Sequence, residues 1–501
     1  MRVPGAGPWR GLAACASISP QVTVSQFPRR LPALTLALAF VGVSLTLRAT
    51  VDHGFVTLYT GDNGESYRLA AARNFEKFGF VAMKFLPALT DIPGATLPEV
   101  LPYYTHSPPL PYLLVAAPYI ASGGSVFAAR LLVILMSLAG LYFATRAAQA
   151  MVSGLAPGDE GARARVLLLM PLFLATSAGV LCYGDALTEV PMQQTVQWML
   201  LLACARFLAT PGAGGSRTLA ALGALQMWIG LEWILPVIVA LGYCVLTRPL
   251  ASEPRRRALL IVFGLGVAAP LGLRLAQNAW ALGGVMPALE DVFHRALFRT
   301  GGDAAYPYSL GRHLGRFAVA TAWLSGFAAP LLIGLDLHDR ARRKREAWNS
   351  TSTLFFLWGL GSLSFQFLMP QAALFHAATS LHPANFILLW GALAAARLWP
   401  TRPKAVAAIL ALQLLSGGVL WATEIGIPFL RGSSTELAGR LCGPHRAELR
   451  AAIPEMSSSV SKMIGARLDA TAPARECGAG SEAAKSVLWT YLRVIRVSSL
   501  E

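Results

Sequence analysis

The chain is 501 residues long, and 55% of its residues are hydrophobic whereas only 14% are charged. Since a soluble domain carries roughly a quarter of its residues as charged side chains, this composition excludes a water-soluble fold. The net charge of +16 does not indicate nucleic-acid binding, because the basic residues lie between long apolar runs and not among aromatic residues on one surface. We therefore expect an all-α polytopic membrane protein.

Residues 1–30 contain arginine but no acidic residue, and the first long apolar run follows at 31–47. The basic stretch is too long for a signal peptide, and Arg48-Ala-Thr is no clear cleavage site. We predict a cytoplasmic N-terminal segment that leads into a first transmembrane helix.

Residues 51–124 form a long mixed-charge segment that we predict to be the first extracytoplasmic loop. Within it, 65–78 repeats apolar residues every three positions, which favours an amphipathic helix along the membrane surface. The apolar stretch 109–122 is short and holds Pro111 and Pro118, so we expect an interfacial or re-entrant helix.

Ten further apolar runs complete a set of about eleven predicted spans of near-membrane length. They lie at 126–145, 165–182, 190–208, 218–230, 232–247, 258–280, 314–335, 351–368, 382–397 and 405–424. Alternate connectors are rich in arginine, as around Arg256 and Arg343, whereas those near Tyr183 and Gly230 hold almost no basic residue. By the positive-inside rule, the first loop, the loops near Asp185 and Asp291, and the tail face the non-cytoplasmic side.

The predicted organisation is thus one multispan domain at 31–424 followed by a small extracytoplasmic tail at 425–501. The six cysteines show no metal-ligand spacing. Cys442 and Cys477 lie in the tail, where they could form a disulfide in an oxidising compartment or remain free thiols.

Four carboxylates lie at the predicted non-cytoplasmic boundary: Asp62 and Glu65 after the first span, and Asp185 and Glu189 after the third. Acidic residues there are costly unless they function. Two neighbouring loops could bring them into one pocket, as a general base for an acceptor hydroxyl or as ligands of a divalent cation. The alternative is structural, with Asp62 and Asp185 capping the helices that follow them.

Two other segments hold candidate binding residues. His106 precedes a rigid proline run and could bind a phosphate or an acceptor group, or could be an exposed loop residue without a role. In the segment with His294, the guanidinium groups of Arg295 and Arg299 lie one helical turn apart and could grip a phosphate. The competing account is that both arginines extend to the solvated interface.

This layout resembles the GT-C superfamily of membrane glycosyltransferases, in particular the branch with protein O-mannosyltransferases and aminoarabinose transferases. The resemblance covers roughly 31–424. It is carried by the acidic pair, then Tyr67, Ala70-Ala-Ala-Arg73-Asn74 and Gly79, and by His106-Ser-Pro-Pro-Leu110. The sequence departs from the family's adjacent Asp-Glu, which here is spread into Asp62-Asn-Gly-Glu65, and Glu232 stands where many relatives have lysine.

The resemblance implies transfer of a sugar from a dolichyl- or undecaprenyl-phosphate donor to a protein, lipid or glycan acceptor. Asp62 or Glu65 would be the catalytic base, with Asp62 favoured and Asp185 assisting, and the arginines would stabilise the departing phosphate. Tyr67, His106, Glu189 and His294 would contact substrate. A divalent cation is an open expectation, since metal dependence varies within the superfamily.

Two other functions compete with the transferase: a multispan transporter or lipid flippase, and a catalytically inactive membrane scaffold. The sequence contains no Walker loop, no His-Glu-x-x-His and no Gly-x-Ser-x-Gly motif. A transporter would place broken helices and charges at the membrane midplane, whereas the carboxylates here gather at one face. We favour the transferase, in the plasma membrane of a bacterium over the endoplasmic reticulum.

Overall fold

The structure is a computed structural model that describes residues 32–51, 64–89, 103–105, 107–209, 213–230, 264–300, 309–342, 349–370, 373, 377–422 and 425. Within these residues the chain is almost entirely helical, and the one β contact is an isolated bridge between Ala88 and Tyr103. The predicted helical class is therefore confirmed. Asp62, His106, Glu232, the span at 232–247 and the tail with Cys442 and Cys477 lie outside the described residues.

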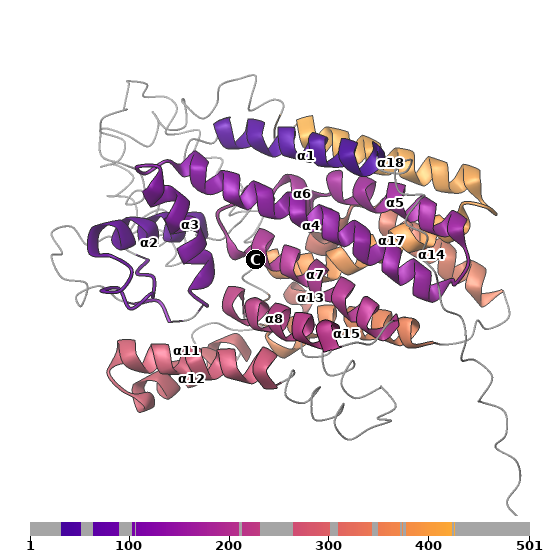
Figure 1. Ribbon diagram of the computed structural model, residues 1–501. Helices are drawn as coiled ribbons and strands as arrows, with labels where there is room; N and C mark the ends of the chain where they lie inside the picture. The colour runs from indigo at the N-terminus through magenta and orange to yellow at the C-terminus, as the bar shows by residue number, and fades with distance from the viewer. Residues whose placement is uncertain are drawn as a thin grey trace, which may run out of the picture.

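Two long helices, α4 (Val126–Leu155) and α7 (Glu189–Ala209), pack along each other at the centre of the bundle. Around them lie α1 (Pro32–Val51), α5 (Glu160–Ala175) and α17 (Leu381–Leu398), as Figure 1 shows. The small residues Gly140, Ala144 and Ala148 on α4 are buried, which allows the neighbouring backbones to approach closely. This core positions the loop between α6 and α7, where two of the candidate carboxylates lie.

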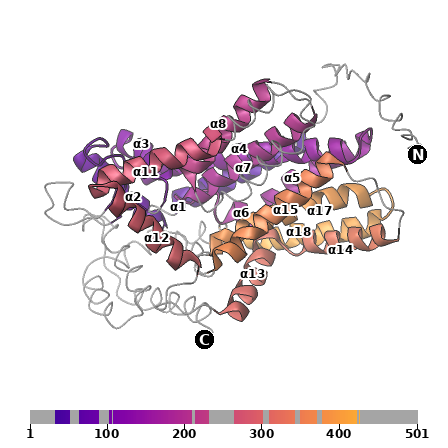
Figure 2. The same cartoon turned by 90° about the horizontal axis from the view of Figure 1, so that it is seen from below.

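The remaining helices lie on the flanks of this core. They are α6 (Ala178–Leu181), α8 (Ala213–Ile229), the π-helical turn η5 (Gly264–Ala268), α11 (Ala269–Leu282), α12 (Val285–Thr300), α13 (Leu310–Ser325), α14 (Ala328–Ala341), α15 (Ser350–Leu368), the 3₁₀ turn η6 (Ala377–Ser380) and α18 (Pro403–Trp421). Helices α11 and α12 form a hairpin beside α8, which both views place at one side of the bundle (Figures 1 and 2). Gly283 ends α11 in the left-handed conformation that glycine favours.

At one end of the bundle, α2 (Gly64–Phe78) packs against α3 (Leu110–Ala121) (Figure 1). Both helices were expected within the first loop. The predicted apolar face of α2 contacts protein, however, because Leu69, Ala72 and Phe75 are buried in the same core as Tyr112 and Val115 of α3. The α2 helix is therefore held against the bundle, and its apolar face is not free to lie in lipid.

The predicted span at 314–335 is not one straight helix. The chain forms α13 and α14 instead, which meet at a bend of 97°. Gly326 at the bend has φ +72°, and a Cβ there would lie 2.6 Å from Oε1 of Gln413 on α18. Only glycine combines that backbone conformation with so close an approach. The run 165–182 is likewise divided, into α5 and the short α6.

Among the described helices, α1, α4 and α18 are long and apolar enough to cross a membrane, and the bent pair α13–α14 would be a fourth span. Helices α15 and α17 occupy the predicted runs 351–368 and 382–397 almost residue for residue. The number of spans stays a prediction.

Candidate functional site

The turn between α6 and α7, residues 182–188, holds a completely buried carboxylate. Asp185 has no exposed surface, and its two oxygens face two arginines. Oδ2 lies 2.9 Å from Nη1 of Arg130 on α4, and Oδ1 lies 3.6 Å from Nε of Arg48 on α1. We call Arg48, Arg130 and Asp185 the buried ion group. Charges so deeply buried persist only when they are paired and hydrogen-bonded.

The backbone around Asp185 is held as firmly as its side chain. Ser137 of α4 donates a hydrogen bond from Oγ to the Gly184 carbonyl oxygen at 2.6 Å, and Arg48 donates to the Leu181 carbonyl oxygen. A Cβ on Gly184 would lie 2.6 Å from both Leu45 Cδ1 and the Val180 carbonyl oxygen, so α1 packs directly onto this turn. The turn thus contacts α1 on one side and α4 on the other.

Glu189, the first residue of α7, forms an ion pair with Arg68 of α2. The Arg68 side chain is 4% exposed and that of Glu189 is 21% exposed. The Arg68 guanidinium also stacks on Tyr112 of α3, with its carbon 4.7 Å from the ring centroid. This contact joins α2, the helix that begins at the predicted acidic pair, to the predicted second acidic loop.

A second polar cluster joins the first predicted loop to the α11–α12 hairpin. Thr105 donates a hydrogen bond from Oγ1 to Oδ2 of Asp291 on α12 at 2.6 Å. The Thr105 carbonyl oxygen accepts from Nη2 of Arg274 at 2.9 Å and from Nδ2 of Asn278 at 3.3 Å, both on α11. Arg299 of α12 lies close enough to Arg274 for their like charges to interact. Among the described residues, two arginines therefore stand close together, and Asp291 lies close to Arg274.

Lys84 contacts the same helix, α11, and has an unusual backbone conformation. Both Lys84 (φ 55°) and Phe85 (φ 57°) occupy the left-handed region, which costs a non-glycine residue of the order of 1 kcal/mol or more. The Lys84 ammonium donates to the Trp280 carbonyl oxygen at 3.3 Å, and Gln277 donates to the Lys84 carbonyl oxygen at 3.0 Å. We call Lys84, Arg274 and Arg299 the basic group.

The predicted site residues fall into three sets. Asp185, Glu189 and Arg299 lie in the contacts just described, and Tyr67 is partly buried near the start of α2. His294 is exposed on α12, with its ring 6.3 Å from that of Phe293. The side chains of Glu65 and Arg295 are not among those described, although both residues lie within helices.

Sequence reasoning missed five basic residues as members of the site. They are Arg48, Arg68, Lys84, Arg130 and Arg274. Their signal was present in the charge pattern, because a basic residue at the predicted non-cytoplasmic end of a span runs against the positive-inside rule. Such a residue needs a carboxylate, a phosphate or another role there.

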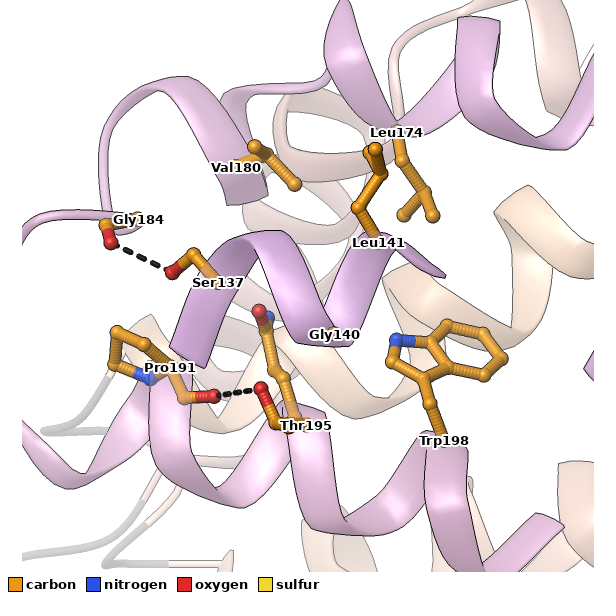
Figure 3. Close-up of a pocket in the computed structure, with 10 residues that line it drawn as sticks. Ser137, Gly140, Leu141, Leu174, Val180, Gly184, Pro191, Thr195 and Trp198 are labelled. Atoms are coloured by element: carbon orange, nitrogen blue, oxygen red, sulfur yellow. Dashed lines mark hydrogen bonds between the residues drawn. The ribbon is translucent and has the colours of Figure 1, made fainter. Parts of the chain in front are cut away.

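A small cavity of about 20 Å³ lies behind the buried ion group, with room for roughly one water molecule. Ser137, Leu141, Val180 and Trp198 are among its lining residues, and Figure 3 shows the Ser137–Gly184 hydrogen bond at its edge. A sugar ring does not fit there. Within the described part of the chain, no three His, Cys, Asp or Glu side chains gather as metal ligands would; the divalent cation stays a prediction.

The fold is similar to those of solved membrane proteins. ArnT from Cupriavidus metallidurans bound to undecaprenyl phosphate matches with a TM-score of 0.50 and 16% identity, over 87% of this chain and 76% of that one. The apo form of the same protein matches with a TM-score of 0.46 and 15% identity, over 87% and 75%. An oligosaccharyltransferase from Archaeoglobus fulgidus in the apo form matches with 0.43 and 13%, over 91% and 61%.

The first of these likenesses shows a shared fold. The chain is therefore a polytopic, predominantly helical membrane protein, as its composition predicted. No family model matches the sequence, and no curated protein matches it significantly.

Proposed function

We propose that this protein is a glycosyltransferase that takes a sugar from a polyprenyl-phosphate donor and transfers it to a hydroxyl-bearing acceptor. The fold shared with ArnT bound to undecaprenyl phosphate is the observation that carries the proposal. The reaction would take place at the end of the bundle that holds α2, α3 and the turn 182–188, which the positive-inside rule predicts to be non-cytoplasmic.

The proposed base is Asp62, with Glu65 as the second candidate. Glu65 lies in the first turn of α2, and Arg68, one turn further, pairs with Glu189. In the proposed reaction the carboxylate removes the proton of the acceptor hydroxyl while that oxygen attacks the anomeric carbon. The bond from the sugar to the phosphate oxygen breaks, and polyprenyl phosphate leaves.

The donor phosphate would bind at the basic group, with Arg295 as a further contact. Arg274 and Arg299 hold like charges close together with Asp291 near Arg274, and the Lys84 ammonium meets α11 at Trp280. Like charges at such a site are stabilised by an anion between them, and a phosphate oxygen is a strong acceptor for guanidinium and ammonium groups. A positive site also favours the charge that develops on a departing phosphate.

The polyprenyl chain of the donor would lie in the same membrane that the protein spans. We propose the plasma membrane of a bacterium, with the site facing the exterior or periplasm. The acceptor would be a protein, a lipid or a glycan.

The test is donor consumption by the purified protein in lipid nanodiscs. Polyprenyl phosphates that carry a labelled hexose or pentose are incubated with extracted membranes as acceptors, and released polyprenyl phosphate is measured. We expect Asp62→Asn to reduce kcat by about 100-fold or more, since a positioned general base contributes 10²–10⁴-fold. Glu65→Gln is measured in parallel to distinguish the two carboxylates.

Glu76→Gln is the matched control, because Glu76 is an exposed carboxylate at the far end of the same helix. It should retain wild-type turnover. Equal activity of Asp62→Asn, Glu65→Gln and wild type would contradict the base assignment. If the wild type consumes no such donor, the transferase proposal fails, and lipid translocation by the protein reconstituted into sealed vesicles becomes the next measurement.

A further inference from the structure

Two ion pairs hold the helices on either side of residues 52–63 to one short stretch of chain. Arg48 is in the last turn of α1 and pairs with Asp185, whereas Arg68 is in the second turn of α2 and pairs with Glu189. The two carboxylates are only four residues apart. The stretch 185–189 therefore contacts both the helix that enters the acidic segment and the helix that leaves it.

The contacts leave Asp185 no free face. One oxygen lies against Arg130 at 2.9 Å and the other against Arg48 at 3.6 Å, and the side chain has no exposed surface. A general base or a ligand needs at least one oxygen that substrate can reach. The geometry of Asp185 thus suits fixing helices in place better than touching an acceptor.

The anchoring at α1 is independent of the anchoring at α2. Leu45, one turn before Arg48, packs onto Gly184, and α4 holds the same turn through Ser137. Arg68 in turn is fixed by Tyr112 of α3 as well as by Glu189. Each of the two helices therefore has one ionic contact to 185–189 and one further contact: α1 packs onto Gly184, and α2 contacts Tyr112 of α3.

We propose that Asp185 and Glu189 are positioning residues that set the distance between the end of α1 and the start of α2. By this means they set where the acidic pair, Asp62 before α2 in the sequence and Glu65 in its first turn, meets its substrates. The inference rests on the proposed function, because Asp62 or Glu65 is the base that would be positioned. It separates the roles of the four carboxylates: the first two act on substrate, and the second two act through helices.

The direct test is a distance measurement between two spin labels by pulsed electron paramagnetic resonance. Labels on Thr50→Cys at the end of α1 and Glu76→Cys on α2 use exposed positions, in a full-length background whose other cysteines are replaced. We expect Glu189→Gln to broaden or shift the distance distribution relative to the parent. The exchanged pair Arg68→Glu with Glu189→Arg should restore it, since an ion pair of the same two positions is re-formed.

A matched control exists at another interhelical ion pair. Asp339 of α14 and Arg402 beside α18 lie 3.0 Å apart, and Asp339 is 17% exposed, close to the 21% of Glu189, whereas Arg402 at 37% is more exposed than Arg68 at 4%. Asp339→Asn should leave the Thr50–Glu76 distance unchanged. Glu189→Gln is the principal variant because Glu189 is partly exposed, so its loss is less disruptive to folding than that of buried Asp185.

Kinetics supply the second readout. We expect Glu189→Gln to lower kcat by about 10-fold and to leave KM for the donor within about twofold, while the acidic limb of the pH–rate profile keeps its position. Loss of that limb would make Glu189 the base itself and would overturn the positioning role. An unchanged distance in Glu189→Gln would overturn it as well, whatever the value of kcat.

The two proposals fail in different ways. Absence of turnover in the wild type with every donor overturns the proposed function, and the spin-label distance still decides the positioning role. Turnover in the wild type with no distance change in Glu189→Gln keeps the transferase and overturns the positioning role.

Discussion

The buried ion group and the basic group lie at the same end of the molecule but differ in burial and in charge balance. Arg48, Arg130 and Asp185 are each less than 5% exposed, and the carboxylate is enclosed by its partners. In the basic group, Lys84 and Arg299 are only partly buried. The nearby carboxylate of Asp291 accepts a hydrogen bond from Thr105. A fully buried and paired set of charges can fix helices in place, whereas basic side chains that are partly exposed can exchange an anion.

Removing the charge of Asp185 should give the largest effect. Asp185→Asn leaves Arg48 and Arg130 buried without their carboxylate, and breaking a buried ion pair costs about 3–5 kcal/mol of folding free energy. We expect a clear fall in thermal stability, measured by fluorescence-detected unfolding in detergent.

Glu160→Gln is the control for that change. Glu160 pairs with Arg163 one turn along α5, and its side chain is 69% exposed. Exposed pairs contribute little, so its stability should match that of the wild type. Equal stability of Asp185→Asn and Glu160→Gln would contradict the view that the buried ion group holds the helices.

Neutralising Lys84 should weaken donor binding and spare the fold. A charge-assisted hydrogen bond to phosphate contributes about 1.5–3 kcal/mol, so Lys84→Gln should raise KM for a polyprenyl-phosphate donor by about 10-fold or more. The measurement is donor titration at fixed acceptor, in the nanodisc assay.

Lys77→Gln is the matched variant, since Lys77 is an exposed lysine at the end of α2 whose ammonium lies 5.0 Å from the centroid of the neighbouring Phe78 ring. It should leave KM unchanged. If both lysine variants raise KM equally, the effect is one of general surface charge, and the basic group is not the phosphate site.

The smallest effect is expected at the contact between the first predicted loop and the α11–α12 hairpin. Thr105→Val removes the hydrogen bond to Asp291, at a cost of about 1 kcal/mol. Amide hydrogens of 285–300 should exchange faster, as measured by mass spectrometry. Thr300→Val, which loses only bonds to its own helix, is the comparison variant, and faster exchange there to the same extent would show that Thr105 has no special part.

Much of the helical framework could be predicted from the sequence. The run 351–368 forms α15, which begins one residue earlier than predicted. A long apolar stretch makes its backbone hydrogen bonds within its own helix wherever that helix packs, so its structure can be predicted locally. The bend within the run 314–335 was not expected, and the Gln413 side chain that lies against Gly326 at this bend comes from nearly ninety residues further along the chain, so no local pattern reports the contact.

The candidate carboxylates could also be identified from the sequence, but the arginines that pair with them could not. Asp185 stood out as an acidic residue at a predicted membrane boundary, and capping of the next helix was the competing interpretation. Its pairing with Arg130 crosses 55 residues of chain, and its pairing with Arg48 crosses more. A carboxylate near an apolar helix can be a base, a ligand or an anchor, and burial and partners distinguish these roles.

The apolar runs and the alternation of charged connectors can both be read from short stretches of the chain. The sequence by itself therefore determined that this protein is helical and embedded in a membrane. Which charges meet is decided by helix packing, since the free energy of a buried ion depends on the few atoms around it. Only the tertiary structure therefore showed that 185–189 contacts both α1 and α2, and that Lys84 lies beside α11.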